Sequence, residues 1–206
     1  MIIYIDDSLI VLDKPAGLLS VPGRGPEHAD SLASRVQADF PEALIVHRLD
    51  MATSGLIVMA RGKEMERRLS IAFQQRRVAK RYVAVVAGRP LTDEGEIALP
   101  LITDWPNRPR QKVDHDTGKP SLTRYEVDST TPAGDTSRVW LYPHTGRSHQ
   151  LRVHMQAIGH PIVGDELYAP APWREAAPRL LLHAESLSLP HPEGGALLEL
   201  RSPAPF

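Results

Sequence analysis

The sequence predicts an α+β protein built on a mixed, mostly antiparallel sheet that is flanked by helices and loops. Short apolar runs bounded by turn residues recur along the chain, which is typical of strands. Three longer segments repeat apolar residues at three- or four-residue spacing, which favours helices. No repeat, low-complexity segment or linker divides the chain, so we expect one domain over residues 1–206.

The strands are expected where apolar or β-branched residues run for four to six positions. The first two runs surround Asp6, Asp7 and Ser8 and should form a hairpin, while the Pro- and Gly-rich segment 14–25 should be loop. The segment 99–127 should alternate short strands with turns. The predicted strands are 2–5, 9–13, 56–60, 82–87, 138–142, 180–183 and 197–200.

The helices are expected over residues 32–40, 63–77 and 148–158. Asp30 or Ser31 can cap the first helix, and Pro41 should end it. The second helix should bury Met65, Leu69, Ala72 and Phe73 on one side and expose its arginines and glutamines. The third helix should end at Gly159.

Composition restricts the function classes. The chain has 206 residues, a formal net charge of −1 and no cysteine, so disulfide and thiolate chemistry are excluded. No apolar run approaches the roughly 20 residues that span a bilayer, and the N-terminal sequence lacks the pattern of a secretory signal. A cytoplasmic location without membrane contact is the simplest expectation.

Positive charge is concentrated in one stretch of the chain. Residues 61–81 hold eight Lys or Arg against two Glu. This local excess predicts either a surface for an anionic partner or a solvated helix face, and charge alone favours neither.

Several common sites are absent from the sequence. The nine histidines lack metal-site spacing, since His149 and His154 do not share a helical face, so structural or surface roles are favoured over a metal site. There is no glycine-rich phosphate loop and no G-x-S-x-G motif, which argues against nucleotide cofactors and serine hydrolysis.

The residues that can carry chemistry lie in three segments. Asp50 stands in VHRLDMATSG, between apolar residues and before a buried strand, where a carboxylate is a nucleophile, a base or half of a structural ion pair. TGRSHQLRVH offers Arg147 and Arg152, either as partners of a carboxylate or on a solvated helix face. Tyr82 follows two basic residues and could stack on a nucleotide, although a strand tyrosine is more often core.

These segments together resemble the RluA-type RNA pseudouridine synthases. The motifs HRLDMATSG (47–55), KRYVAVVAG (80–88) and TGRSHQLRVH (145–154) occur in the family's order, and LDKPAGLLSVPG (12–23), HPIVGDELY (160–168) and RLLLHA (179–184) also match. The segment 99–113 resembles the branch with dual specificity for large-subunit ribosomal RNA and transfer RNA. We expect the chain to start directly at the catalytic domain, without the N-terminal S4-type domain of some relatives.

The resemblance implies a reaction and residue roles. Uridine in RNA is isomerised to pseudouridine without cofactor or metal, with Asp50 as the essential aspartate, acting as nucleophile or base. Tyr82 corresponds to the tyrosine that packs on the uracil, Arg152 to the arginine that pairs with the aspartate, and Arg48 to the residue that enters the RNA stack. The expected RNA contacts are Arg48, His47, Arg67, Arg68, Arg76, Arg77, Lys80, Arg108, Arg110, Lys112 and Arg147.

Two other classes compete with a monomeric synthase acting on ribosomal RNA or a transfer RNA anticodon stem-loop. A non-catalytic RNA-binding module could keep the fold, but the intact set of Asp50, Tyr82 and Arg152 argues against it. A glycoside hydrolase usually needs two paired acids, and no convincing second acid stands beside Asp50 in the sequence.

Overall fold

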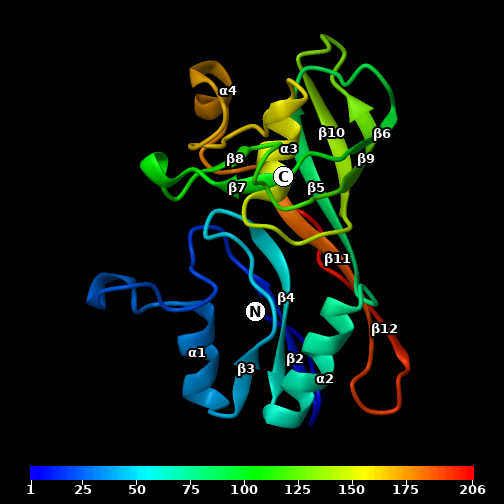
Figure 1. Cartoon of the computed structure of the whole chain (residues 1–206). Helices are drawn as coiled ribbons and strands as arrows, with labels where there is room; N and C mark the ends of the chain where they lie inside the picture. Colours follow the sequence, from blue (N-terminus) through cyan, green and yellow to red (C-terminus); the bar gives the residue numbers. More distant parts are fainter. The chain divides into compact units, whose positions relative to one another are not determined.

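The computed structural model describes residues 1–206, which group into two compact units (Figure 1). The first unit contains residues 1–80 and 183–205, and the second contains residues 81–182 and Phe206. No helix is both long enough and apolar enough to cross a membrane.

The first unit is a sheet with two helices. Its strands run in the order β1-β2-β4-β11, with β3 paired to β4 and β12 paired to β11. Strands β4 and β11 are parallel, and the other pairs are antiparallel. The elements are β1 (Ile2–Ile5), β2 (Leu9–Lys14), α1 (Leu32–Asp39), β3 (Ala43–Ile45), β4 (Ser54–Arg61), α2 (Lys63–Gln74), β11 (Leu182–Pro190) and β12 (Leu197–Arg201), with a 3-10 turn at Pro26–His28.

The core of this unit lies between α2 and the sheet. Leu69 and Ala72 of α2 are buried against Val58 of β4 and Leu187 of β11, with Met65 and Phe73 packed at the edge of the same cluster. The predicted inner stripe of this helix is therefore confirmed, and its burial fixes the helix on the strand that follows Asp50.

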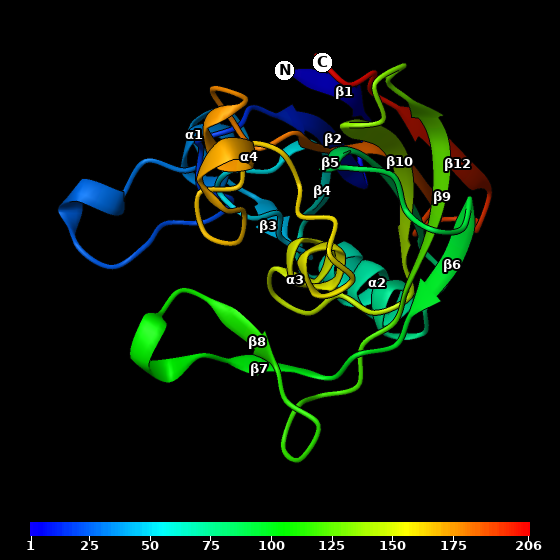
Figure 2. The ribbon, with the colours of Figure 1, turned by 90° about the horizontal axis from the view of Figure 1, so that it is seen from above.

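The second unit contains an antiparallel sheet and a separate hairpin. The sheet order is β5-β10-β9-β6, and β7 pairs only with β8. Figure 2 shows the β7–β8 hairpin extending away from β9 and β10. The elements are β5 (Ala79–Ala87), β6 (Glu94–Ile97), β7 (Leu101–Thr103), a 3-10 turn η2 (Trp105–Asn107), β8 (Gln111–Val113), β9 (Thr123–Thr130), β10 (Thr136–Pro143), α3 (Gln150–Ala157) and α4 (Ala171–Glu175).

Helix α3 is buried nearly all round, which its apolar stripe does not reveal. Its polar side chains are satisfied by the neighbouring strands: Gln150 Nε2 donates to Thr123 Oγ1 at 2.9 Å, and His154 Nδ1 lies 2.9 Å from the same hydroxyl. Burial lowers the pKa of His154. The helix that carries Arg152 is therefore locked into the core of the second unit.

The predicted fold class is confirmed, with corrections to individual elements. Strands β3 and β6 and helix α4 were not predicted because runs of three to five residues show no usable period. Helix α2 ends at Gln74 rather than at residue 77, since Arg76 takes a left-handed φ of 57°. Strand β11 extends to Pro190 rather than ending at residue 183. Its residues beyond 183 alternate between buried and half-exposed positions and do not form the continuous apolar run used to predict strands.

Gly55 marks the closest approach of the two parallel strands. Its φ is +112°, and a Cβ there would collide with the backbone of Ala184 on β11. We expect Gly55→Ala to lower the free energy of unfolding by about 2 kcal/mol more than Gly194→Ala. Gly194 has a φ of +77°, but a Cβ added there would meet open space. Urea denaturation of both variants measures this difference, and equal losses would contradict the packing argument.

Candidate active site

Asp50 is presented by a loop of the first unit that runs from β3 into β4. Its carbonyl accepts a hydrogen bond from Thr53 N at 3.1 Å, which closes a tight turn. The carboxylate residue is half-buried, whereas Leu49 on one side is buried and Met51 on the other is 53% exposed. The turn therefore brings Asp50 to the boundary between core and solvent, where a ligand can reach a carboxylate.

The loop is fixed on both sides of Asp50 by the Pro- and Gly-rich segment that follows β2. Ser20 Oγ donates to Leu49 O at 2.7 Å and accepts from Leu49 N at 3.1 Å. Met51 O accepts from Gly17 N at 2.8 Å. The backbone around Asp50 therefore has little freedom to turn the carboxylate away.

Lys14 completes this clamp from inside the protein. Its side chain is fully buried, and Nζ donates to three carbonyl oxygens: Pro15 at 2.9 Å, Leu18 at 2.8 Å and Met51 at 3.1 Å. An ammonium group has three N–H donors, so these acceptors match it. One buried cation thus joins the 14–18 turn to the residue next to Asp50.

The hydroxyl group of Ser54, four residues after Asp50, is held in a structural contact. Ser54 Oγ lies 2.8 Å from His183 Nδ1, and His183 Nε2 lies 2.9 Å from the carbonyl of Ser202. Ser54, His183 and Ser202 are all buried. Ser54 therefore helps to hold the start of the strand that follows Asp50.

Arg152 is held by a bidentate ion pair within the second unit. Its Nε donates to Asp165 Oδ2 at 2.8 Å and its Nη2 to Oδ1 at 2.6 Å, and both residues are buried. Asp165 Oδ1 also accepts from the backbone amides of Leu167 and Tyr168. Two parallel hydrogen bonds fix the plane and direction of a guanidinium group.

The ring of Tyr168 adds a second constraint on Arg152. The guanidinium carbon lies 5.1 Å from the centre of that ring. The hydroxyl of Tyr168 lies 2.7 Å from His149 Nδ1 and accepts from Gln111 N at 2.8 Å. The alternative of a solvated helix face is therefore wrong for Arg152, whereas Arg147 is exposed.

Tyr82 lies on β5, opposite Leu141 of β10, and is half-buried. The preceding residue, Arg81, stacks over the ring of Trp140 at 4.3 Å. The tyrosine is thus on a strand of the second unit, as the sequence predicts. Its catalytic role stays a prediction.

The two residues before Leu49 differ in their surroundings. Arg48 is exposed. His47 Nε2 accepts a hydrogen bond from Val58 N at 3.0 Å, and its ring stacks on Phe73 at 4.6 Å. Burial and then the nearby Lys80 charge lower the pKa of His47 to about 3, and burial lowers the pKa of Lys80. His47 is therefore neutral and holds the loop to β4, while its predicted RNA contact stays untested.

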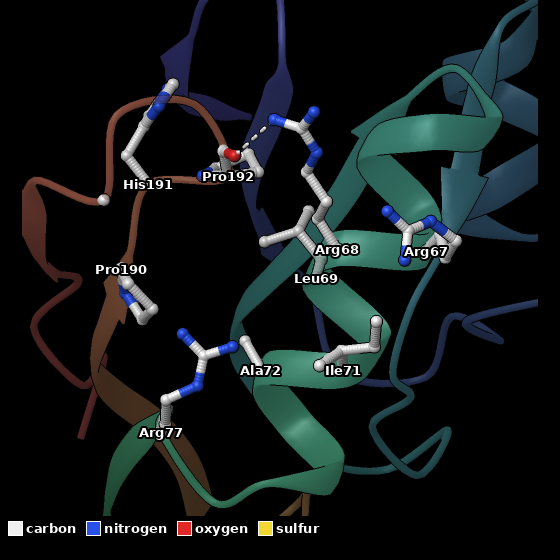
Figure 3. Close-up of a pocket in the computed structure, with 10 residues that line it drawn as sticks. Arg67, Arg68, Leu69, Ile71, Ala72, Arg77, Pro190, His191 and Pro192 are labelled. Carbon is white, nitrogen blue, oxygen red and sulfur yellow. Dashed lines mark hydrogen bonds between the residues drawn. The ribbon is translucent and has the colours of Figure 1, made fainter.

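The basic helix α2 borders a hollow of about 280 Å³ on the first unit (Figure 3). Glu64 accepts from Arg67 and from Arg68, and these bonds lower the pKa of Glu64 to about 2. Arg68 also donates to the carbonyl of Pro192 at 3.0 Å. Arg77 donates only to the neutral amide of Gln75, so its charge is less compensated than those of the other two.

The remaining predicted RNA contacts are exposed. They are Arg76 on the first unit and Arg108, Arg110 and Lys112 on the β7–β8 hairpin, with Lys112 Nζ 3.6 Å from Asp114. No group of three or more His, Asp or Glu residues is arranged to hold a metal ion.

Sequence reasoning missed Lys14, Ser20 and Asp165 as supports of the site. Lys14 and Ser20 lie in LDKPAGLLSVPG, and Asp165 lies in HPIVGDELY. Both segments contributed to the resemblance, but no role was assigned to their polar residues. The usable signal was a charged residue inside an otherwise apolar or turn-rich motif.

The comparisons with known proteins identify the family of this chain. The RNA pseudouridylate synthase family matches residues 8–157. The dual-specificity RNA pseudouridine synthase RluA of Escherichia coli (strain K12) is 56% identical over 206 residues, which cover 100% of this chain and 94% of that protein. RluA of Yersinia pestis is 54% identical over 206 residues, which cover 100% of both chains.

A solved structure gives the same result at lower identity. Human RNA pseudouridylate synthase domain containing 1 superposes with a TM-score of 0.82 at 31% identity, covering 100% of this chain and 83% of that chain. The chain therefore belongs to the RNA pseudouridylate synthase family. It is an RNA pseudouridine synthase, and this finding favours catalysis over a non-catalytic RNA-binding module.

The buried contacts of Lys14 generate a stability prediction. Lys14→Met keeps the length of the side chain but removes the donor to the carbonyl oxygens of Pro15, Leu18 and Met51, of which Met51 O keeps only the amide of Gly17. We expect the free energy of unfolding to fall by about 3 kcal/mol or more, measured by urea denaturation. Lys63→Met, at a side chain that is 81% exposed, is the matched control and should change little. Equal effects of both substitutions would contradict a clamp at Lys14.

Proposed function

We propose that this chain isomerises specific loop uridines in RNA to pseudouridine, with Asp50, Tyr82 and Arg152 as the catalytic residues. The observation that carries the proposal is the Asp50 loop, whose backbone is fixed by Ser20, Gly17 and Lys14 on either side of the carboxylate. A fixed carboxylate at the edge of the core is suited to act on a substrate that enters from solvent.

The reaction breaks the bond from N1 of the uracil to C1′ of the ribose and joins C5 to C1′. C5 loses a proton and N1 gains one, so atoms and charges balance without a co-reactant. The Asp50 carboxylate serves this exchange by attacking the sugar or by removing a ribose proton, and it stabilises positive charge that develops at C1′. Tyr82 would pack on the uracil and assist removal of the C5 proton.

The uridine must leave the RNA stack before these atoms can be reached. We propose that Arg48, which is exposed two residues before Asp50, occupies the space that the base leaves. Arginines and lysines on α2 and on the β7–β8 hairpin would bind phosphates, which makes RNA binding weaken with rising salt.

The substrates we propose are large-subunit ribosomal RNA, a transfer RNA anticodon stem-loop, or both. RluA of Escherichia coli and RluA of Yersinia pestis are dual-specificity enzymes, which supports more than one RNA substrate. We further propose that residues 1–206 form the catalytic domain and that it acts in the cytoplasm. We propose that it acts as a monomer, because one chain carries Asp50, Tyr82 and Arg152.

Asp50→Asn removes the negative charge while keeping the shape of the side chain. We expect pseudouridine formation on a synthetic transfer RNA anticodon stem-loop and on total RNA from cells lacking the protein to fall by at least about 1,000-fold. RNA affinity, measured by filter binding, should stay within about threefold. Turnover at the wild-type rate would refute the assigned role of Asp50.

Arg48→Ala tests the proposed replacement of the flipped base. Unstacking costs a few kcal/mol and is least costly in a flexible loop. We therefore expect the loss of kcat/KM to be about tenfold larger for a uridine in a stacked or paired context than for one in an open loop. Single-turnover assays on two matched RNAs give the ratio, and an equal loss on both would count against insertion of Arg48.

A further inference from the structure

The β7–β8 hairpin of the second unit ends in an exposed aromatic and cationic tip. All six residues from Trp105 to Arg110 are exposed. Trp105 is 65% exposed, and the Arg108 guanidinium carbon lies 4.6 Å from the centre of its ring. The exposed ring beside a cation presents a flat apolar face that a ligand can cover.

The tip is preorganised by its own backbone. Asn107 N donates to Asp104 O at 3.0 Å, Arg110 N to Asn107 O at 3.0 Å, and Asp104 N to Arg110 O at 2.9 Å. Asn107 Nδ2 also donates to Asp104 Oδ2 at 2.9 Å. A tip whose backbone is held in this way loses little conformational entropy when a ligand binds to it.

The base of the hairpin is tied to the support of Arg152. Gln111 N donates to the hydroxyl of Tyr168 at 2.8 Å, and the ring of Tyr168 lies under the Arg152 guanidinium. Gln111 also accepts from Thr103 Oγ1 at 3.2 Å across the hairpin. A ligand on the tip would therefore be held in a fixed relation to a candidate catalytic side chain of the same unit.

The chemistry of the tip selects its ligand. Arg108 contacts the Trp105 ring, and Arg110 is exposed beside it, so the tip joins an aromatic face to positive charge. Unpaired nucleotides present a flat base and a phosphate together, and aromatic rings beside arginine bind them by stacking and charge. We propose that Trp105 stacks on an unpaired base of the RNA substrate, outside the target uridine, and that Arg108 and Arg110 contact the adjoining phosphates.

This inference rests on the proposed RNA function and adds a residue that selects the substrate. Trp105 would bind a second nucleotide of the loop, so it should affect substrate affinity and leave the chemical step unchanged. RNAs whose loop offers no unpaired base besides the target uridine would lose the contact with Trp105.

Steady-state kinetics on an RNA stem-loop that the wild-type protein modifies provide the test. We expect Trp105→Ala to raise KM about tenfold with kcat within about twofold, and Trp105→Phe to restore KM to within about threefold. Leu91→Ala is the matched control, since Leu91 is fully exposed on another loop of the same unit. It should leave both constants unchanged.

A fluorescence titration in the Asp50→Asn background tests stacking without turnover. RNA should quench tryptophan emission, and Trp105→Phe should remove most of that quenching. An unchanged KM in Trp105→Ala would overturn the proposal, and it is the result expected if the tip binds a protein partner. A loss confined to kcat would also overturn it. If the wild-type protein forms no pseudouridine in any RNA, the proposed function fails instead.

Discussion

The buried ammonium of Lys14 is the interaction on which the Asp50 loop depends. A loop next to a substrate cannot bury many apolar side chains, so it has to be held by polar contacts to the body of the protein. Lys14 supplies these contacts from a strand, together with Ser20 and Gly17 from the following turn. The cation is stable in the interior because its donors match three carbonyl oxygens.

The second unit also holds a charged side chain in place by buried polar contacts, but with different groups. Arg152 comes from a helix that is buried nearly all round, and Asp165 fixes its orientation through two hydrogen bonds. Tyr168 then connects this ion pair to His149 and to the β7–β8 hairpin. Each unit thus holds its candidate site residue in place through buried polar contacts.

The sequence predicted the parts of the fold and site that have a local signal. Helix α2 and strands β2 and β4 were predicted because their apolar residues recur at the period of the element, and Asp50, Tyr82 and Arg152 because their motifs resemble a family. Strand β3 is too short for a period. Burial of Lys14 and the pairing of Arg152 with Asp165 depend on contacts across the fold, which residue type and spacing do not specify.

The Arg152–Asp165 pair has a consequence for how the family can diverge. Losing either partner removes the bidentate bonds that hold the other charge in a buried site, which costs several kcal/mol, whereas replacing both together is far milder. The two positions are therefore energetically coupled. Among natural variants they should be kept or exchanged jointly, and a lineage that has changed only one of them would need a compensating group at the same point of the core.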